Sequence, residues 1–184
     1  MRQVPWWGWA LGAGAAGAAI VWLARSSPSA PADTRGDTRN PGALARRRAQ
    51  MMPHLREAAA RHGLPLAWLL AFAHKESLFQ NLRSKLGARD DVRGGAFGPL
   101  QMTSETARRL GFLPSASHPE RGRAILADPA TGIDLGARYL ARLVAELGPE
   151  LPRVAAAYNG AGRLAREVYA PRVVALADRY ARVA

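Results

Sequence analysis

The sequence predicts an all-α domain, and three observations support this prediction. Apolar residues recur at helical spacing, and the segments that carry them start near Pro, Ser, Thr or Asp and stop at Gly. No segment alternates apolar and polar residues as a half-buried strand does. Hydrophobic residues make up 48% of the 184 residues, which is enough for one core. The chain has no Cys, so disulfides and Cys-ligated metals are excluded.

The first two predicted helices lie in the N-terminal half. "PHLREAAARHG" starts at Pro53 and stops at Gly63, since Pro favours the first helical position and Gly the position after the end. "LPLAWLLAFAHKES" follows, with Pro65 in its first turn, and its almost wholly apolar composition predicts a buried helix.

The remaining helices are predicted from the same signals, which gives about six in all. "TSETARRLG" has Thr103 or Ser104 as N-cap, and "DPATGIDLGARYLARLVAELG" has Asp128 as N-cap. The last two are "LPRVAAAYNG" and "PRVVALADRYARV". Two connections, residues 80–97 and 112–127, are predicted to be long loops, which in a small helical domain usually bind ligands or cover a site.

The N-terminal segment differs from the rest of the chain. Val4–Ala24 carries no charge, has the length of a membrane-spanning helix, and has Trp residues at both ends. We favour an uncleaved signal anchor over residues 1–25, with a cleaved signal peptide as the alternative, because small residues follow at Ser27–Ala32. Residues 26–48 are predicted to be a flexible linker and 49–184 the folded domain.

The formal net charge of +12 predicts attraction to polyanions. Nucleic acid is not the expected partner, because no recognition motif or zinc-finger spacing is present. The four histidines are scattered, so no metal site is predicted either. An acidic cell-wall polymer fits the charge equally well.

Glu76 is the strongest candidate for a catalytic residue. It ends the apolar helix, where a low dielectric and the negative end of the helix dipole both disfavour an ionised carboxylate. A raised pKa suits a general acid at neutral pH. His74, two residues earlier, is expected to face elsewhere on the helix.

Four segments in order resemble the lytic transglycosylases of the soluble type (SLT domain, lysozyme-like superfamily). They are the Glu76-Ser77 pair, "GPLQM" from Gly98, "GARYL" from Gly136 and "AYNG" from Ala157. The resemblance covers about Pro53 to Tyr180, and "YAPRVVALADRY" is similar to the closing helix of that family. It implies a lysozyme-like helical fold that binds peptidoglycan glycan strands and needs no cofactor.

The resemblance also implies roles for single residues. Glu76 matches the acid that cleaves the bond between N-acetylmuramic acid and N-acetylglucosamine, with a 1,6-anhydro sugar as product. Gln101, Tyr158 and Asn159 match substrate-site positions, and the Tyr158 hydroxyl is expected to orient Glu76. Further candidates for substrate binding are Ser77, Gly98 and Thr103, although Ser77 is expected mainly to fix the local turn. Gly95 and Gly98 are expected to let the backbone approach the glycan.

Two alternatives stay open. The stretch "DDVRGGAFGPLQM" resembles goose-type lysozymes, so Asp90 or Asp91 could be a second carboxylate in a hydrolase that uses water. A non-catalytic wall-binding module is the other alternative, although such a module has no use for a buried acid. The apolar segment 4–24 predicts attachment to the inner membrane, with the domain in the periplasm. A phage lysis enzyme, acting from the host inner membrane, is favoured slightly over an enzyme for local wall opening.

Overall fold

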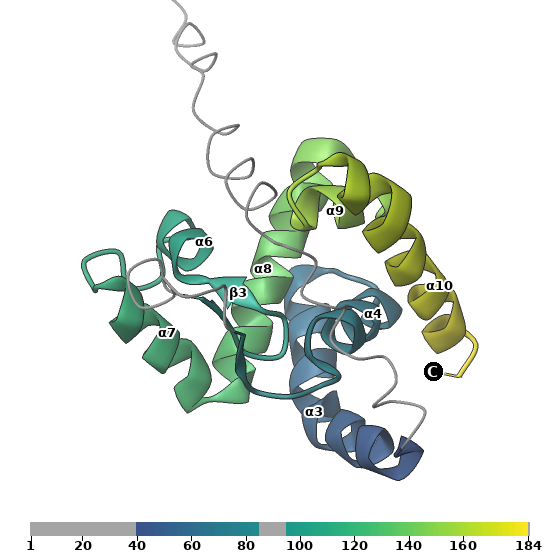
Figure 1. Ribbon diagram of the computed structural model, residues 1–184, viewed down its shortest axis with the longest axis horizontal. Helices are drawn as coiled ribbons and strands as arrows, with labels where there is room; N and C mark the ends of the chain where they lie inside the picture. The colour runs from purple at the N-terminus through teal and green to yellow at the C-terminus, as the bar shows by residue number, and fades with distance from the viewer. Residues whose placement is uncertain (1–39, 85–94, 184) are drawn as a thin grey trace, which may run out of the picture.

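Residues 40–84 and 95–183 are described by the computed structural model, and within these ranges seven α-helices, one π-helical turn and a small sheet are present (Figure 1). The helical fold class is therefore confirmed. The predicted anchor and most of the predicted linker lie outside the described residues. Among the described helices, none is long and apolar enough to cross a bilayer.

Helix α3 (Pro41–His62) begins well before the predicted start at Pro53. The side chain of Asn40 caps it by accepting a hydrogen bond from the Ala43 N–H (3.0 Å), and Pro41 occupies the first turn. Pro53 lies inside the helix on its exposed side. Residues 41–48, which we predicted as the end of the linker, are helical, so that boundary was wrong.

Helix α4 (Leu66–Ser77) forms where predicted and buries most of its length. Leu69 and Phe72 are fully buried, as its apolar sequence requires. The helix ends with two residues in the left-handed region, Leu78 at φ 53° and Phe79 at φ 61°. These turn the chain sharply just after Glu76, and Phe79 is buried in the core.

Three two-residue strands form an antiparallel sheet that the sequence did not predict. They are β1 (Arg83–Ser84), β2 (Ala96–Phe97) and β3 (Met102–Thr103), in the order β1-β2-β3. Arg83 pairs with Phe97, and Phe97 pairs with Met102. Strands this short show no alternation, which is why the pattern missed them.

Two helices follow the sheet. Helix α6 (Ser104–Arg109) has Thr103 as its N-cap, one of the two predicted candidates. Helix α7 (His118–Ala127) lies in the segment that we predicted as a loop, so that prediction was wrong. A capping box formed by Ser117 and Glu120 starts α7.

The C-terminal half follows the prediction more closely. Helix α8 (Pro129–Leu147) is capped by Asp128, whose carboxylate accepts from the Ala130 N–H (3.1 Å). Helix α9 (Leu151–Tyr158) and helix α10 (Ala170–Ala181) also lie where expected. Immediately before α10 the backbone forms an unpredicted π-helical turn, η1 (Ala165–Tyr169).

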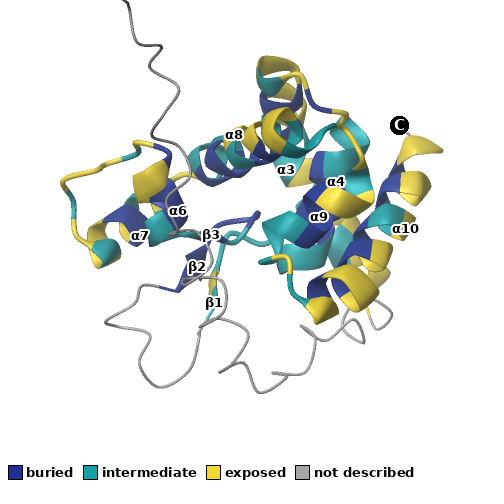
Figure 2. Cartoon of the chain, turned by 90° about the horizontal axis from the view of Figure 1, so that it is seen from above, coloured by how far each residue is buried: buried dark blue, intermediate teal, exposed yellow. Residues whose placement is uncertain are grey.

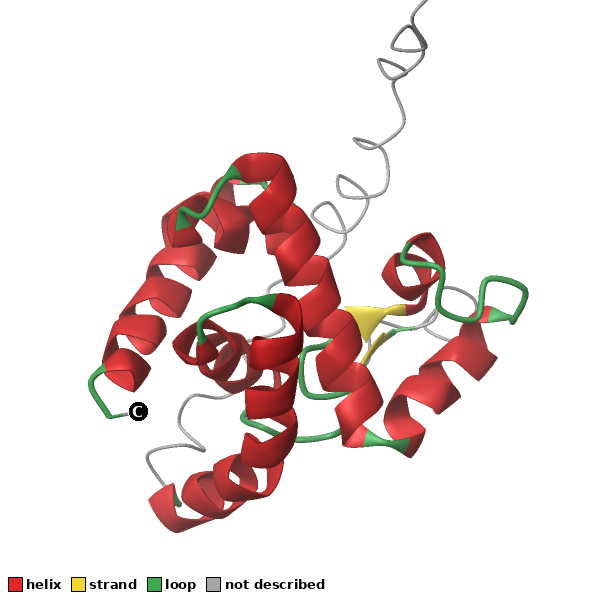
Figure 3. Cartoon of the chain, turned by 180° about the vertical axis from the view of Figure 1, so that it is seen from behind, coloured by secondary structure: helices red, strands yellow, loops and turns green. Residues whose placement is uncertain are grey.

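The core has two parts, with α8 crossing between them. The larger part joins α3, α4, α9 and α10, and the smaller joins the sheet, α6 and α7. Figure 2 shows the buried faces of these elements turned inward, and Figure 3 shows the strands beside α6 and α7 on one side of α8. Tyr139 and Tyr158 pack against both parts, so these two tyrosines lie at the boundary between the two parts of the core.

Candidate functional site

Glu76 lies on the last turn of α4 and is half-buried. Burial raises the pKa of its carboxyl group above the ordinary value of 4.5, while a hydrogen bond from Tyr169 and the positive charge of Lys75 oppose this rise. The upward direction predicted from the sequence is confirmed, and burial is its main cause. A carboxyl group of this kind holds its proton at higher pH than an exposed glutamate does.

Tyr169 is the residue that contacts Glu76, and the sequence did not identify it. Its hydroxyl donates a hydrogen bond to Glu76 Oε1, across 93 residues of sequence. The Tyr169 side chain is buried, at the end of the π-helical turn η1, and its ring lies 6.5 Å from that of Phe72. The Lys75 ammonium lies 5.0 Å from the centre of the Tyr169 ring. The only sequence signal was the position of Tyr169 at the start of "YAPRVVALADRY".

Tyr158 has a different role from the predicted one. Its hydroxyl donates to the Leu100 carbonyl (2.6 Å), so the expectation that it orients Glu76 was wrong. Its ring packs on Phe72, with 4.7 Å between centroids, and on Tyr139 at 5.4 Å. Burial, and then the charge of Glu76, raise the pKa of Tyr158 well above its usual range, so the phenol stays protonated. Tyr158 therefore lies within the electrostatic reach of Glu76 and fixes the loop at Leu100.

Gln101 is held in that loop by its own backbone and side chain. The backbone of Gln101 is in the left-handed region, with φ 48°. Its amide nitrogen Nε2 donates to the carbonyls of Leu82 (3.1 Å) and Gly98 (2.7 Å). Because both partners are carbonyls, both amide hydrogens are used, and only the oxygen Oε1 remains to accept a hydrogen bond from a ligand.

Gly95 and Gly98 are buried against protein, not opened toward a ligand. A Cβ at Gly95 would lie 2.6 Å from the Ser84 carbonyl, and one at Gly98 would lie 3.2 Å from Ile125 Cγ2. The prediction that these two glycines admit the glycan was therefore wrong. Their small size lets the sheet and the helices α7 and α8 approach each other.

The other predicted positions have local structural roles. Thr103 Oγ1 accepts from the Thr106 N–H (3.1 Å) as the cap of α6. Asn159 ends α9, where its backbone N–H donates to Ala155 and Ala157. His74 turns away from Glu76, as predicted, with Nδ1 2.6 Å from the Tyr180 hydroxyl. Asp90 and Asp91 lie outside the described residues, and within those residues no group of three metal-ligating side chains is present.

Ser77 connects the end of α4 to the loop that carries Gln101. It is 4% exposed, so its proposed contact with substrate is replaced by contacts with protein. Its hydroxyl donates to the Pro99 carbonyl (2.8 Å) and lies 3.1 Å from that of Ala73. Its oxygen accepts from the Gln80 N–H (3.1 Å). The expectation that Ser77 fixes the local turn is confirmed.

Replacing Ser77 with alanine is expected to lower the free energy of unfolding by about 1–3 kcal/mol, because the buried Pro99 carbonyl loses its hydrogen-bond donor and the half-buried Gln80 N–H loses one of its two acceptors. Urea unfolding followed by circular dichroism measures this change. The matched control is Ser115→Ala, at an exposed position, which should change stability by less than about 0.5 kcal/mol. Equal stability of the two variants would contradict the structural role of Ser77.

The arrangement is that of one carboxyl group with a raised pKa at the junction of two packed regions, with a buried phenol donating a hydrogen bond to one of its oxygens. A comparison with protein-family models finds a match to the transglycosylase SLT domain over residues 53–172, about two thirds of the chain. The match includes Glu76, Gln101, Tyr158 and Tyr169 and confirms the resemblance seen in the motifs. The chain therefore belongs to the SLT transglycosylase family, whose members act on peptidoglycan.

Proposed function

We propose that the protein is a lytic transglycosylase that cleaves the β-1,4 bond between N-acetylmuramic acid and N-acetylglucosamine and forms a 1,6-anhydro sugar. Family membership supports cleavage of peptidoglycan in general. The observation that carries the finer proposal is Glu76, whose pKa is raised by burial and whose Oε1 is fixed by Tyr169. A single carboxyl group that can first donate and then accept a proton is what this reaction requires.

The proposed reaction uses Glu76 twice. In the first step protonated Glu76 gives its proton to the glycosidic oxygen, and the bond from that oxygen to C1 of the muramic sugar breaks. The acetamido group of the substrate stabilises the positive charge at C1, so no second carboxylate is needed. In the second step the Glu76 carboxylate takes the proton of the 6-hydroxyl as that oxygen bonds to C1. Glu76 ends protonated again, and no water is consumed.

The hydrogen bond from Tyr169 assigns different tasks to the two carboxyl oxygens. Oε1 accepts from the phenol, so the transferable proton belongs on Oε2. Because Tyr169 is buried and packed beside Phe72, its phenol is held in one place. We therefore assign Tyr169 as a positioning residue that directs Oε2 toward the glycosidic oxygen.

Tyr169→Phe is expected to lower kcat by about 10- to 100-fold, since a hydrogen bond to a charged group is worth roughly 1.5–3 kcal/mol. The hydrogen bond from Tyr169 lowers the pKa of Glu76, so its loss raises that pKa further. The high-pH limb of the rate profile, where Glu76 loses its proton, should then move to higher pH. Turbidity clearing of sacculi across a pH series measures both effects.

The control for this variant is Tyr180→Phe. Tyr180 is also buried, but its hydroxyl contacts His74. This variant should therefore leave the high-pH limb of the rate profile at the wild-type pH. If Tyr169→Phe lowered the rate but left the high-pH limb of the rate profile at the same pH, Tyr169 would have only a packing role.

Digestion of purified sacculi by the full chain, followed by mass spectrometry of the sugar ends, tests the reaction itself. A 1,6-anhydro product supports the transglycosylase. A product heavier by one water would replace it with the goose-type hydrolase, and Asp90→Asn and Asp91→Asn would then identify the second carboxylate. Asp90 and Asp91 lie outside the described residues, so this mass measurement is the one that separates the two reactions.

The site of action follows from the substrate. Peptidoglycan lies outside the cytoplasm, so we propose that the domain is exported and that residues 4–24 hold it at the inner membrane. Fusion of residues 1–48 to alkaline phosphatase tests export. The presence of the fusion protein in the membrane fraction of the cells tests whether residues 4–24 hold it at the membrane. A role in phage lysis, as opposed to local wall opening, predicts rapid clearing of the culture on induction of the full chain.

A further inference from the structure

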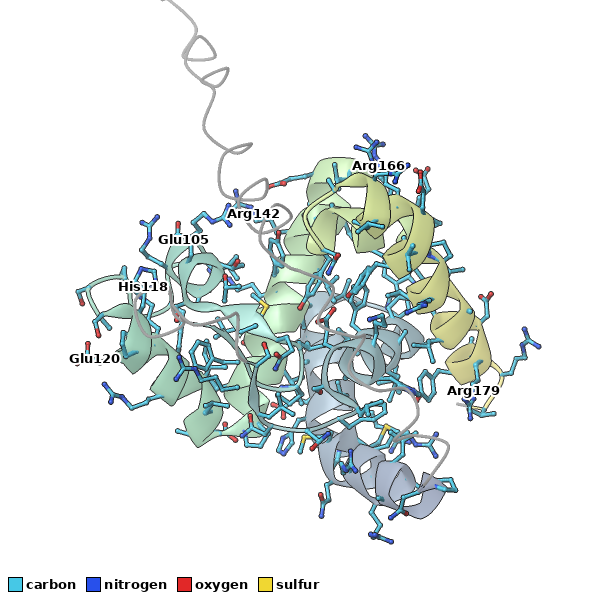
Figure 4. The ribbon with its side chains drawn as sticks, in the orientation of Figure 1. Glu105, His118, Glu120, Arg142, Arg166 and Arg179 are labelled. Carbon is cyan, nitrogen blue, oxygen red and sulfur yellow. The ribbon has the colours of Figure 1, made fainter. Side chains whose placement is uncertain are left out.

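A hollow of about 270 Å³ lies between α3, the first half of α4 and the C-terminal end of α10. It is lined by three arginines, Arg48, Arg56 and Arg179, and five less polar residues, Met52, Leu66, Leu70, Tyr180 and Val183. Figure 1 shows these three elements side by side near the C-terminus, and Figure 4 places Arg179 at the end of α10. No carboxylate is among the residues that line the hollow.

The positive charges of the hollow lack acidic partners in the described part of the chain. The ion pairs there engage other basic residues, namely Arg61, His62, Arg108, Arg109, Arg142 and Arg163. Arg48 and Arg56 lie two turns apart on one face of α3, and Arg179 comes from α10. Three guanidinium groups around one concavity repel one another, and an anion bound between them would reverse that repulsion.

The floor of the hollow is apolar. Met52, Leu66 and Leu70 contribute hydrocarbon and thioether surface, and Val183 beside them is 69% exposed. Tyr180, which is buried, also lines the hollow, and its hydroxyl lies 2.6 Å from His74 Nδ1. The Arg48 guanidinium lies 5.9 Å from the centre of the Tyr180 ring. A positive rim over an apolar floor complements an anionic amphiphile better than it complements a fully hydrated anion.

The hollow is also separate from the proposed catalytic site. It contacts α4 at Leu66 and Leu70, whereas Glu76 is about 9–15 Å further along the same helix. It lies on α3, the first described helix, and 39 residues precede Asn40, among them the uncharged stretch Val4–Ala24.

We propose that this hollow binds the phosphate headgroup of an anionic phospholipid, with the adjoining lipid carbons on its apolar floor. The three arginines contact the phosphate, and the face formed by α3, the first half of α4 and the end of α10 docks on the membrane surface. This proposal is independent of the reaction at Glu76. It also holds whether or not residues 4–24 remain attached.

The test uses the full chain with a single cysteine, since the sequence has none. Val183→Cys carries an environment-sensitive fluorophore at the hollow, and Ala127→Cys carries the same fluorophore at the exposed end of α7. Each protein is reconstituted into phosphatidylcholine vesicles with or without roughly 30 mol % phosphatidylglycerol. We expect a blue shift of the Val183 label that requires phosphatidylglycerol and weakens with salt, and no such shift at Ala127.

The arginines are tested with a matched pair of triple variants. R48Q/R56Q/R179Q should raise the phosphatidylglycerol fraction needed for half of the shift, or abolish the shift, with binding weakened by about tenfold or more. R123Q/R138Q/R172Q removes the same charge from exposed positions outside the hollow and should keep the shift. R56E alone, at an exposed position, should act like the first triple variant even if that variant folds poorly.

Four results would overturn the proposal. The first is the absence of any shift in phosphatidylglycerol vesicles. The second is an equal loss of the shift in both triple variants, which would indicate that net charge alone, and not the hollow, causes binding. The third is the same shift on adding inorganic phosphate to phosphatidylcholine vesicles, which would indicate a free-phosphate site. The fourth is a larger shift with purified sacculi than with anionic vesicles, which would indicate a wall polyanion.

Discussion

Glu76→Gln is expected to reduce the rate of glycan cleavage by about 10³-fold or more, since general acid catalysis contributes roughly 10²- to 10⁴-fold. Glutamine has nearly the same shape and still accepts the hydrogen bond from Tyr169, but it cannot give a proton to the leaving oxygen. Release of muropeptides from sacculi, measured by chromatography, gives the rate. Binding to sacculi should be retained, because the side chain keeps its size.

The control for the activity of this variant is Glu57→Gln on α3. Glu57 is exposed and pairs with Arg61, so its loss should leave activity unchanged. Full activity of Glu76→Gln would show that the catalytic group is elsewhere, or that the chain is a wall-binding module whose lytic activity has another origin.

The same substitution is expected to change how stability depends on pH. The pKa of Glu76 is raised in the folded protein, so the folded state binds its proton more tightly than the unfolded state does. The contribution of Glu76 to the free energy of unfolding is therefore fully present below about pH 4.5, the ordinary pKa. It is lost as the pH rises through the raised pKa of the folded state. Glu76→Gln removes that loss, so thermal melts at pH 4 and pH 8 should differ less than in the wild type.

Gly136→Ala, a small substitution away from Glu76, is expected to be strongly destabilising. Alanine in a helix interior normally stabilises by about 0.5–1 kcal/mol relative to glycine. At Gly136 on α8, however, a Cβ would lie 2.4 Å from Leu100 Cδ1 and 2.6 Å from Leu100 Cβ. A change of rotamer cannot relieve the contact with Leu100 Cβ, so the backbone of the loop must move.

Overpacking of this kind costs about 1–3 kcal/mol, and we expect the melting temperature to fall by roughly 4–8 °C. Because Leu100 precedes Gln101 and accepts the hydrogen bond of Tyr158, activity should fall by about 10- to 100-fold. The control is Gly42→Ala near the start of α3, where the nearest atoms to a Cβ are 3.5 and 3.7 Å away. A neutral result at Gly136 would mean that the loop is not fixed by α8.

The sequence predicted helices best where capping and burial agree. α8 has Asp128, Pro129 and Gly148 at its ends, and α4 is apolar throughout. α7 was missed because Gly122 and the buried Arg121 interrupt its apolar pattern, although its capping box was visible in the sequence. The start of α3 was misplaced because Pro53 looks like the proline of a first helical turn. The true N-cap and first-turn proline, Asn40 and Pro41, lie in a segment with the composition of a linker.

For the candidate site, the sequence pointed to Glu76 but not to Tyr169, which donates a hydrogen bond to it. Glu76 could be found because one charged residue at the end of an apolar helix is a local pattern. Tyr169 could not, since its contact with Glu76 depends on the packing of α4 against the C-terminal helices. Tyr158 and Gln101 were found as positions, but their bonds to the Leu100 and Leu82 carbonyls are properties of the folded loop.

The π-helical turn at Ala165–Tyr169 makes the Glu76–Tyr169 contact depend on an extra residue. A π turn arises when one residue is inserted into an α-helix. Deleting one of residues 165–168 would restore α geometry and rotate Tyr169 and α10 together by about 100° relative to the residues before the turn. Such a deletion would therefore separate the phenol of Tyr169 from Glu76.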